Sequence, residues 1–297
     1  MTAADTTATR ESRRKLGVMF NTDRMAGEAL VACAQRVEEI GLDTFWVPEL
    51  FGREPFSTSA HLLAHTQELQ MATGIVNIYA RDATAAAAGA RTLAEFSGGR
   101  FVLGVGVSNA GLVGMRGHDW DPPVERLAAY LDGIAAARLS VPGDETAPVH
   151  VAAHGPKMVE MAAGKADGLS TYLQDPSHTA SVRSQLRDDQ AINVSLMCLL
   201  CDDPTEARRL ARRAIDFYVG LAYYHRAWRR LGFDDSDFVD GGSDRLVDTL
   251  VAWGSEDQIG RRVDEHLDAG ATELVVIPLN PAGGAEPHWP VLEALAG

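Results

Sequence analysis

Residues 149–172 read VHVAAHGPKMVEMAAGKADGLSTY and contain a complete strand–helix–strand unit. The apolar run 149–153 predicts a strand, and Pro156 predicts the start of a helix because proline is favoured in the first helical turn. Helical spacing continues to residue 166, and the run 168–172 predicts a second strand. Two strands joined by one helical crossover lie parallel, so this unit indicates a parallel sheet covered by helices.

The same alternation extends over most of the chain. Amphipathic segments with helical spacing separate the apolar runs, and Asp175-Pro176, Asp203-Pro204 and Ser255 mark three helix starts with a capping side chain. Eight apolar runs are predicted strands, and they cover residues 16–20, 44–47, 71–79, 101–107, 149–153, 168–172, 192–201 and 273–278.

Eight such units predict a closed (β/α)8 barrel of the TIM type, an α/β fold, rather than an open doubly wound sheet. No linker or change in composition divides residues 14–297, so we expect one barrel domain. Residues 1–13 are polar and lack periodicity, which predicts a disordered N-terminal tail. Residues 218–242 are the least regular part, and we expect them to form an insertion over the C-terminal mouth of the barrel.

The charge balance argues against nucleic acid as a partner. The chain has 41 acidic and 27 basic residues, a formal net charge of −14 that repels phosphate backbones. Basic residues gather only at helical spacing among acidic and apolar residues, which favours a solvated helix face. These residues are Arg208, Arg209, Arg212, Arg213, Arg226, Arg229 and Arg230.

Three cysteines are too few for a disulfide framework and predict a reducing, cytoplasmic location. Cys198 and Cys201 form a C-x-x-C within a predicted strand, where side chains three apart point to opposite faces. We therefore expect two core residues and no shared metal. The apolar run after Arg13-Arg14 is too short for an export signal, and no stretch has the length of a membrane span.

Ligands of such barrels bind at the carboxyl ends of the strands, so the residues after each strand are the candidates for a site. His154-Gly155-Pro156 joins a strand to a helix, and a glycine there leaves backbone amides open to an anion in the field of the helix dipole. Lys157 adds a positive charge. A phosphate site and a plain helix start remain equal alternatives from this segment alone.

Glycines interrupt two other predicted strands near the mouth. Gly104 and Gly106 leave space for a flat ring or for another backbone. Gly74 indicates either an ordinary β-bulge or a bulge against which a flat cofactor packs.

Four segments together resemble the luciferase-like, coenzyme F420-dependent oxidoreductases, and most closely an actinobacterial subgroup of them. The segments are RFVLGVGVS (100–108), AAHGPKMVEMA (152–162), ATGIVN (72–77) and residues 243–271, and the resemblance covers residues 16–278. It implies a (β/α)8 barrel with a deazaflavin or flavin in the mouth, a cis peptide at Gly74-Ile75, and a homodimer. The cofactor-binding residues expected on this basis are Gly74, Ile75, Asn77, Gly106, Val107, Ser108, Ala153, His154, Gly155, Pro156 and Lys157.

Two departures from the sugar-phosphate dehydrogenase branch of that family concern proton transfer. In that branch an acid–histidine pair follows the second strand, whereas this chain has Glu49-Leu50 at the matching positions. That branch also has a glutamate after the fourth strand, where this chain has Asn109. The acid and base of that branch are therefore not carried over, and the sugar-phosphate reaction is doubtful.

The catalytic candidates are Glu49, Asn109 and His154. Glu49 is equally well a structural acid bonded to loop amides, and His154 can act through its backbone alone. Tyr79, Arg81 and His118 are further candidates for proton transfer, whereas the pair His61 and His65 is expected on the surface or in packing. A tyrosine-rich segment within 218–228 is expected to serve packing first, with one or two side chains facing the substrate.

The resemblance implies hydride transfer between coenzyme F420 and a small organic substrate with a C=C, C=O or C=N bond, or the corresponding alcohol. The alternative on the same fold is an FMN-dependent monooxygenase. A non-catalytic flavin-binding protein is a third possibility, because the histidine and the glutamate of the family are absent.

Overall fold

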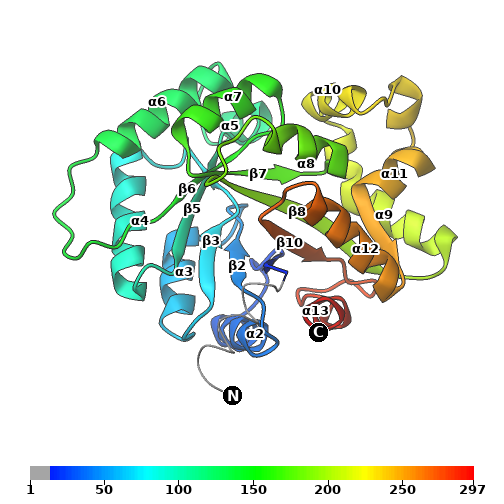
Figure 1. Cartoon of the computed structure of the whole chain (residues 1–297), viewed down its shortest axis with the longest axis horizontal. Helices are drawn as coiled ribbons and strands as arrows, with labels where there is room; N and C mark the ends of the chain where they lie inside the picture. Colours follow the sequence, from blue (N-terminus) through cyan, green and yellow to red (C-terminus); the bar gives the residue numbers. More distant parts are fainter. Residues whose placement is uncertain (1–13) are drawn as a thin grey trace.

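Eight parallel strands close into a barrel in this computed structural model, which describes residues 14–297 (Figure 1). The predicted tail, residues 1–13, lies outside the described residues. The strands of the whole sheet are β1 (Leu16–Met19), β2 (Thr44–Val47), β3 (Gln70–Thr73), β4 (Val76–Asn77), β5 (Phe101–Gly106), β6 (Val149–Ala152), β7 (Gly168–Tyr172), β8 (Ala191–Leu200), β9 (Val251–Gly254) and β10 (Glu273–Pro278).

Helices follow nearly every strand and cover the outside of the barrel (Figure 1). They are α2 (Gly27–Glu39), α3 (Pro55–Leu63), α4 (Ala83–Ser97), α5 (Ala110–Met115), α6 (Pro123–Ala136), α7 (Pro156–Lys165), α8 (Pro176–Arg183), α9 (Pro204–Val219), α10 (Ala222–Arg230), η1 (Asp235–Phe238), α11 (Asp244–Leu250), α12 (Glu256–Asp268) and α13 (Trp289–Ala296). The capping side chains predicted at Asp175, Asp203 and Ser255 are confirmed.

The barrel closes because β1 and β8 both pair with β10. Leu16 of β1 aligns with Leu274 of β10, and Asn193 of β8 aligns with Glu273 of the same strand. The ring then runs β10, β1, β2, β3, β5, β6, β7, β8, with every pair parallel. These are the eight predicted strands, so the predicted (β/α)8 barrel is confirmed.

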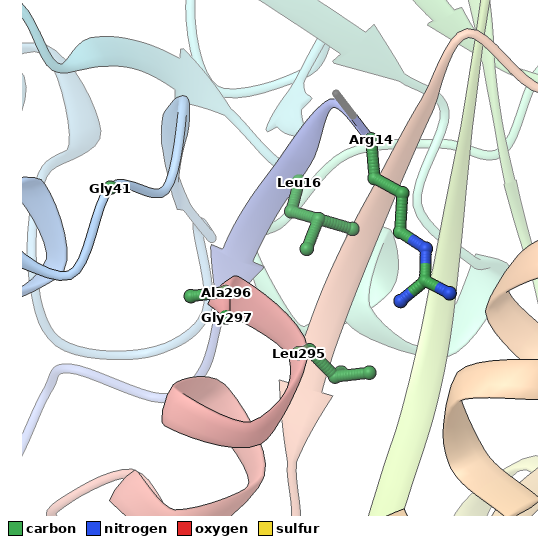
Figure 2. A pocket seen from close by; sticks show the side chains of 6 residues that line it. All are labelled: Arg14, Leu16, Gly41, Leu295, Ala296 and Gly297. Carbon is green, nitrogen blue, oxygen red and sulfur yellow. The ribbon is translucent and has the colours of Figure 1, made fainter. Parts of the chain in front are cut away.

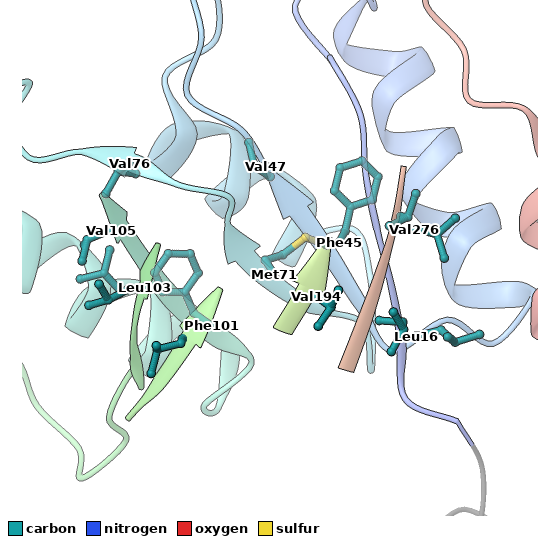
Figure 3. Close-up of a cluster of buried hydrophobic side chains, with 14 of the residues drawn as sticks. Leu16, Phe45, Val47, Met71, Val76, Phe101, Leu103, Val105, Val194 and Val276 are labelled. Atoms are coloured by element: carbon teal, nitrogen blue, oxygen red, sulfur yellow. The ribbon is translucent and has the colours of Figure 1, made fainter. Parts of the chain in front are cut away.

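Alternate residues of the strands contribute to two different hydrophobic cores. One set packs outward against the helices, and Figure 3 shows Phe45, Met71 and Phe101 within that buried layer. The other set meets inside the barrel, where Trp46 and Val102 form a small cluster with neighbouring strands. Successive residues of a strand point to opposite faces, which is why each apolar strand supplies both cores.

The structure corrects four details of the sequence interpretation. The expected strand 71–79 is broken into β3 and β4 on either side of residues 74–75. Strand β9 was not predicted, and it pairs with the carboxyl-terminal end of β8. Residues 218–242 are largely helical, since they contain α10 and η1. Cys198 is buried as expected, whereas Cys201 is only half-buried because β8 ends at Leu200.

A second core joins α9, α10 and α11 to the carboxyl ends of β7 and β8. Trp228 of α10 is fully buried, and its indole Nε1 donates a hydrogen bond of 2.9 Å to the Leu173 carbonyl just after β7. This contact confirms that the segment 218–242 lies at the mouth side of the barrel. None of the helices in the described range 14–297 is long and apolar enough to cross a membrane.

Candidate active site at the barrel mouth

The predicted site residues lie on three neighbouring strands of the barrel. Residues 74–77 belong to the β3–β4 segment, residues 106–109 end and follow β5, and residues 153–157 connect β6 to α7. Because β5 pairs with β4 on one side and with β6 on the other, the fold brings all three segments to one sector of the mouth. Glu49 follows β2, and its carboxylate lies in the same sector because it accepts a hydrogen bond from the Asn77 amide.

The break between β3 and β4 contains a cis peptide at Gly74–Ile75, as the family resemblance implied. A Cβ on Gly104 would lie 1.9 Å from the Thr73 carbonyl oxygen, so only glycine permits this approach of the two strands. The Thr73 hydroxyl also donates to the Gly104 carbonyl at 2.8 Å. Of the two explanations for Gly104, the close approach of another backbone is therefore the one observed.

Gly106 makes room for the side chain of Ile75. A Cβ at residue 106 would lie 2.7 Å from the Ile75 Cδ1 methyl group and 3.2 Å from the Cβ of Ala152. Ile75 is half-buried, so part of its surface remains open at the mouth. The result is a small apolar surface next to the loop of Val107 and Ser108.

Glu49 is held by three hydrogen bonds. Its two carboxylate oxygens accept from both terminal nitrogens of Arg81, and one of them also accepts from the Asn77 amide at 2.7 Å. Asn77 in turn accepts from the Tyr79 amide through its side-chain oxygen. These contacts fit the structural role considered for Glu49, because both oxygens are engaged.

Asn109 caps the short helix α5. Its side-chain oxygen accepts from the Leu112 amide at 3.0 Å, and Ser108 before it has a φ of 61°. A side chain used in this way holds the loop after β5 in place. It offers no group for acid–base chemistry.

The N-terminus of α7 faces open space. Gly155 is the N-cap with φ −92° and ψ 152°, and no side chain caps this helix. A Cβ added to Gly155 would meet only the Arg230 Nη2 atom, at 3.9 Å. Lys157 is exposed in the first turn.

Arg230 of α10 is the residue that the sequence interpretation missed. Within the described residues, no hydrogen bond or ion pair engages its guanidinium, whereas Arg208, Arg209, Arg212 and Arg229 each pair with an acidic side chain. Arg209, Arg213, Arg226, Arg229 and Arg230 are exposed, as the solvated helix face predicted, whereas Arg208 and Arg212 are half-buried. Arg230 also stands beside the N-terminus of α7, a relation that helical spacing alone could not show.

His154 is neutral at physiological pH. Burial, followed by the neighbouring His178 and Arg230, lowers the pKa of His154 to about 4. Its Nδ1 atom is buried and has no hydrogen-bond partner within the described part of the chain. The same is true of both amide atoms of Gln174, which follows β7. These polar atoms are available to a polar ligand.

Aromatic side chains from α9 and α10 complete this side of the mouth. Tyr224 lies 5.6 Å from the His154 ring, and Tyr218 meets Tyr172 edge to face with the ring centroids 5.1 Å apart. Trp228 and Tyr224 are buried and serve packing, as expected, while Tyr218 and Tyr223 are half-buried.

The other histidines considered from the sequence lie away from this sector or on its edge. His118 lies 6.1 Å from the Tyr79 ring in the loop after α5. His61 and His65 are exposed and pack against each other, and the His65 Nδ1 interacts with the His61 carbonyl. Among residues 14–297, no group of histidine, cysteine or acidic side chains has the arrangement of a metal site.

A surface pocket lies at the opposite end of the barrel (Figure 2). It is lined by Arg14, Leu16, Gly41 and the C-terminal residues 295–297. Leu16 begins β1 and Gly41 precedes β2, so the pocket is at the amino ends of the strands. Barrel enzymes place their chemistry at the carboxyl ends, and this pocket is therefore separate from the candidate site.

Comparison with known proteins connects this geometry to one family. The family described as luciferase-like monooxygenase matches residues 11–273. A 5,10-methylenetetrahydromethanopterin reductase of Methanolobus tindarius is 26% identical over 84% of this chain and 90% of its own length. A Mycobacterium tuberculosis protein named as a coenzyme F420-dependent oxidoreductase is 25% identical, with 86% and 90% covered.

The fold is also found among solved structures. The coenzyme F420 dependent tetrahydromethanopterin reductase from Methanopyrus kandleri superposes with a TM-score of 0.74, covering 96% of this chain and 98% of that one. Their sequences are 16% identical, so this likeness shows the (β/α)8 barrel and no more.

Proposed function

The chain belongs to the luciferase-like monooxygenase family, and we propose that it is an oxidoreductase that uses coenzyme F420 to transfer a hydride to or from a small organic substrate. When bound, F420 supplies a deazaflavin ring that carries hydride at carbon. The substrate bond is C=C, C=O or C=N, or the corresponding alcohol. The observation that carries the proposal is the uncapped N-terminus of α7 beside the unpaired Arg230, at the same mouth as the half-buried Ile75 side chain.

The residues at the mouth fit a cofactor with a flat ring and a phosphate. The half-buried Ile75 and the loop of Val107 and Ser108 offer a small apolar surface to one face of a ring. In this proposal Gly74, Asn77 and Gly106 keep that surface in place. The Asn77 amide does so through its 2.7 Å hydrogen bond to Glu49.

The phosphate would meet the amides of His154, Gly155 and Lys157, with Pro156 setting the first helical turn, whereas the Ala153 amide donates to the Ser170 carbonyl at 3.1 Å and holds the start of the segment in the sheet. Open backbone amides and the helix dipole favour an anion there. Arg230 supplies a positive charge beside Gly155, whereas His154 is neutral. The unpartnered Nδ1 of His154 and the amide group of Gln174 provide further hydrogen bonds to a polar ligand.

Glu49 would act as a positioning residue in this scheme. It fixes Arg81 and the strand carrying Asn77, and both of its oxygens are already engaged. Asn109 would hold the loop after β5 through its cap of α5. Neither residue then moves a proton, and the donor comes from another side chain of the mouth or from water.

A binding comparison tests the proposal. Purified protein is titrated into F420 and, separately, into FMN, and the quenching of each fluorescence gives a Kd. We expect F420 to bind at least ten-fold more tightly. Tighter binding of FMN would instead support the flavin-dependent monooxygenase, the alternative that the description of the family favours.

One observation favours a third role, that of a flavin-binding protein without catalysis. The Glu49 carboxylate is ion-paired and Asn109 is an amide that caps a helix, so neither supplies a free acid or base. Oxidation of reduced F420 with any organic acceptor, faster than in the absence of protein, would eliminate this role.

We also propose that residues 14–297 act as one domain and that the protein is a cytoplasmic homodimer. The family resemblance supports the dimer, and three free cysteines suit a reducing compartment. Sedimentation velocity at micromolar concentration tests the oligomeric state.

A further inference from the structure

Tyr172 points into the barrel at the carboxyl end of β7. Gly168, four residues earlier on the same face, lies against the His150 ring, and His150 lies 6.4 Å from the Trp46 ring inside the barrel. Residues two apart on a strand share a face, so Ser170 and Tyr172 are also directed inward. Tyr172 is the last residue of its strand and therefore stands at the mouth.

Three further tyrosines surround Tyr172 from the α9–α10 segment. Tyr218 contacts Tyr172 at an interplanar angle of 85°, and Tyr224 contacts Tyr218 at 81° with centroids 5.4 Å apart. Tyr223 lies 4.6 Å from Tyr224. Edge-to-face packing of this kind is favourable and holds the rings in fixed orientations. We call Tyr172, Tyr218, Tyr223 and Tyr224 the tyrosine wall.

Three members of the tyrosine wall, Tyr172, Tyr223 and Tyr224, have a raised pKa and keep their hydroxyl groups protonated. Burial is the largest cause that raises the pKa of Tyr172 well above its ordinary value, and the neighbouring Tyr218 adds to it. Burial likewise raises the pKa of Tyr223 to about 12. Neutral phenols are hydrogen-bond donors at physiological pH, and they suit an uncharged oxygen acceptor better than a cation or a metal.

The opposite rim of the mouth carries two exposed apolar side chains next to the Glu49–Arg81 ion pair. In the ring of eight strands, β2 stands four strands away from β7, so the loop after β2 is across the mouth from the tyrosine wall. This loop carries Leu50 and Phe51, which are 39% and 76% exposed. Exposed apolar side chains beside a binding site commonly contact a ligand.

We propose that the tyrosine wall is the specificity-determining surface for the substrate, which is an uncharged molecule with a carbonyl oxygen on an apolar body. Tyr218 donates a hydrogen bond to the carbonyl oxygen, Tyr172 holds the Tyr218 ring in place, and the apolar body faces Phe51. This inference rests on the proposed function, because it presumes that the cofactor occupies the sector from β3 to β6. The positive charge of Arg230 is then used by the cofactor, and the tyrosine wall itself offers no positive charge to a phosphorylated sugar.

The experiment uses trans-4-phenylbut-3-en-2-one as a planar conjugated ketone and F420-loaded protein. Titration calorimetry gives the Kd of the ketone for the wild type, for Tyr218→Phe and for the control Tyr130→Phe. Tyr130 lies on α6 and is buried away from the tyrosine wall, with its hydroxyl 3.4 Å from the Asp82 carbonyl. We expect a three- to ten-fold weaker Kd for Tyr218→Phe, the loss of one neutral hydrogen bond, and no change for Tyr130→Phe.

The Kd of F420 itself is measured on the same three proteins by fluorescence quenching. If F420 binds none of them, the proposed function is wrong and this inference is overturned with it. If F420 binds all three equally, the inference alone is overturned by either of two results. One is that the ketone binds Tyr218→Phe as tightly as the wild type, or binds neither. The other is that glucose 6-phosphate binds the wild type more tightly than the ketone does.

Discussion

Arg81 holds Glu49 by both carboxylate oxygens, at 2.7 and 3.1 Å, and the two side chains are only 15% and 7% exposed. The pair joins the loop after β2 to the segment after β4, because the Asn77 amide shares one of the same oxygens. A bidentate ion pair that is shielded from solvent in this way fixes both segments. Its position at the edge of the mouth makes it part of the framework of the site.

Replacing Glu49 by glutamine should destabilise the fold. Arg81 would keep only the exposed Glu54, at 3.3 Å, and a shielded charge that loses its partner commonly costs about 3 kcal/mol. Urea denaturation measures the change. Glu293→Gln is the control, since its ion pair with Arg36 is largely exposed and should contribute less than about 1 kcal/mol. Unchanged stability of Glu49→Gln with lost turnover would show that the carboxylate acts in the chemistry.

Gly155→Val should weaken F420 binding by roughly ten- to hundred-fold, because a side chain would stand in front of the amides of α7. The backbone of Gly155 is in an ordinary extended conformation and its surroundings are open, so the melting temperature of the cofactor-free protein should stay the same. His154→Ala should have a smaller effect on the Kd because the backbone amide remains. A larger effect of His154→Ala would assign the site to the imidazole.

Arg230→Gln should raise the Kd of F420 by about ten-fold, the order expected for one charge-assisted hydrogen bond. The loss should be smaller at high salt, since exposed charges are screened. Arg226 is one turn earlier on α10 and exposed, so Arg226→Gln is the matched control. Equal effects of the two substitutions would indicate a diffuse electrostatic attraction and no specific contact.

The sequence predicted the barrel because each of its strands carries its own signal. A run such as 192–201 carries apolar residues on both faces, and a capped helix follows it, so local pattern and global fold agree. Strand β9 escaped prediction because VAWG is only four residues long and follows directly on the helical pattern of α11. Its pairing with β8 is a tertiary contact that no local periodicity encodes.

The candidate site could be predicted only where one chain segment defines it. The open start of α7 was visible in His154-Gly155-Pro156, because the glycine and the proline are adjacent in sequence. Arg230 and Tyr172 could not be assigned in the same way. Arg230 lies on a different helix, 75 residues after Gly155, and comes close to α7 only in the folded protein. Tyr172 likewise contacts Tyr218 only after folding.

Acid should destabilise the protein between pH 6.5 and 4, before most carboxylates titrate. Burial, followed by the nearby Arg262, lowers the pKa of His266 to about 4, and His150 and His154 behave similarly. In the unfolded chain these histidines therefore bind protons from about pH 6.5 downward, while in the folded protein they stay neutral until about pH 4. The contribution of these neutral histidines to the free energy of unfolding is complete above about pH 6.5 and is lost as the pH falls towards 4.

His266→Gln tests this directly, because His266 is fully buried and contacts the Thr179 hydroxyl at 3.0 Å. The slope of the unfolding free energy against pH gives the number of protons taken up on unfolding, whatever the variant does to stability itself. Near pH 5.3 this number should fall by about one in His266→Gln, as a single histidine with these two pKa values requires. His61→Gln should leave the slope unchanged, since His61 is exposed in both states. Identical slopes for His266→Gln and the wild type would mean that His266 is protonated in the folded protein, against the effect expected from its burial.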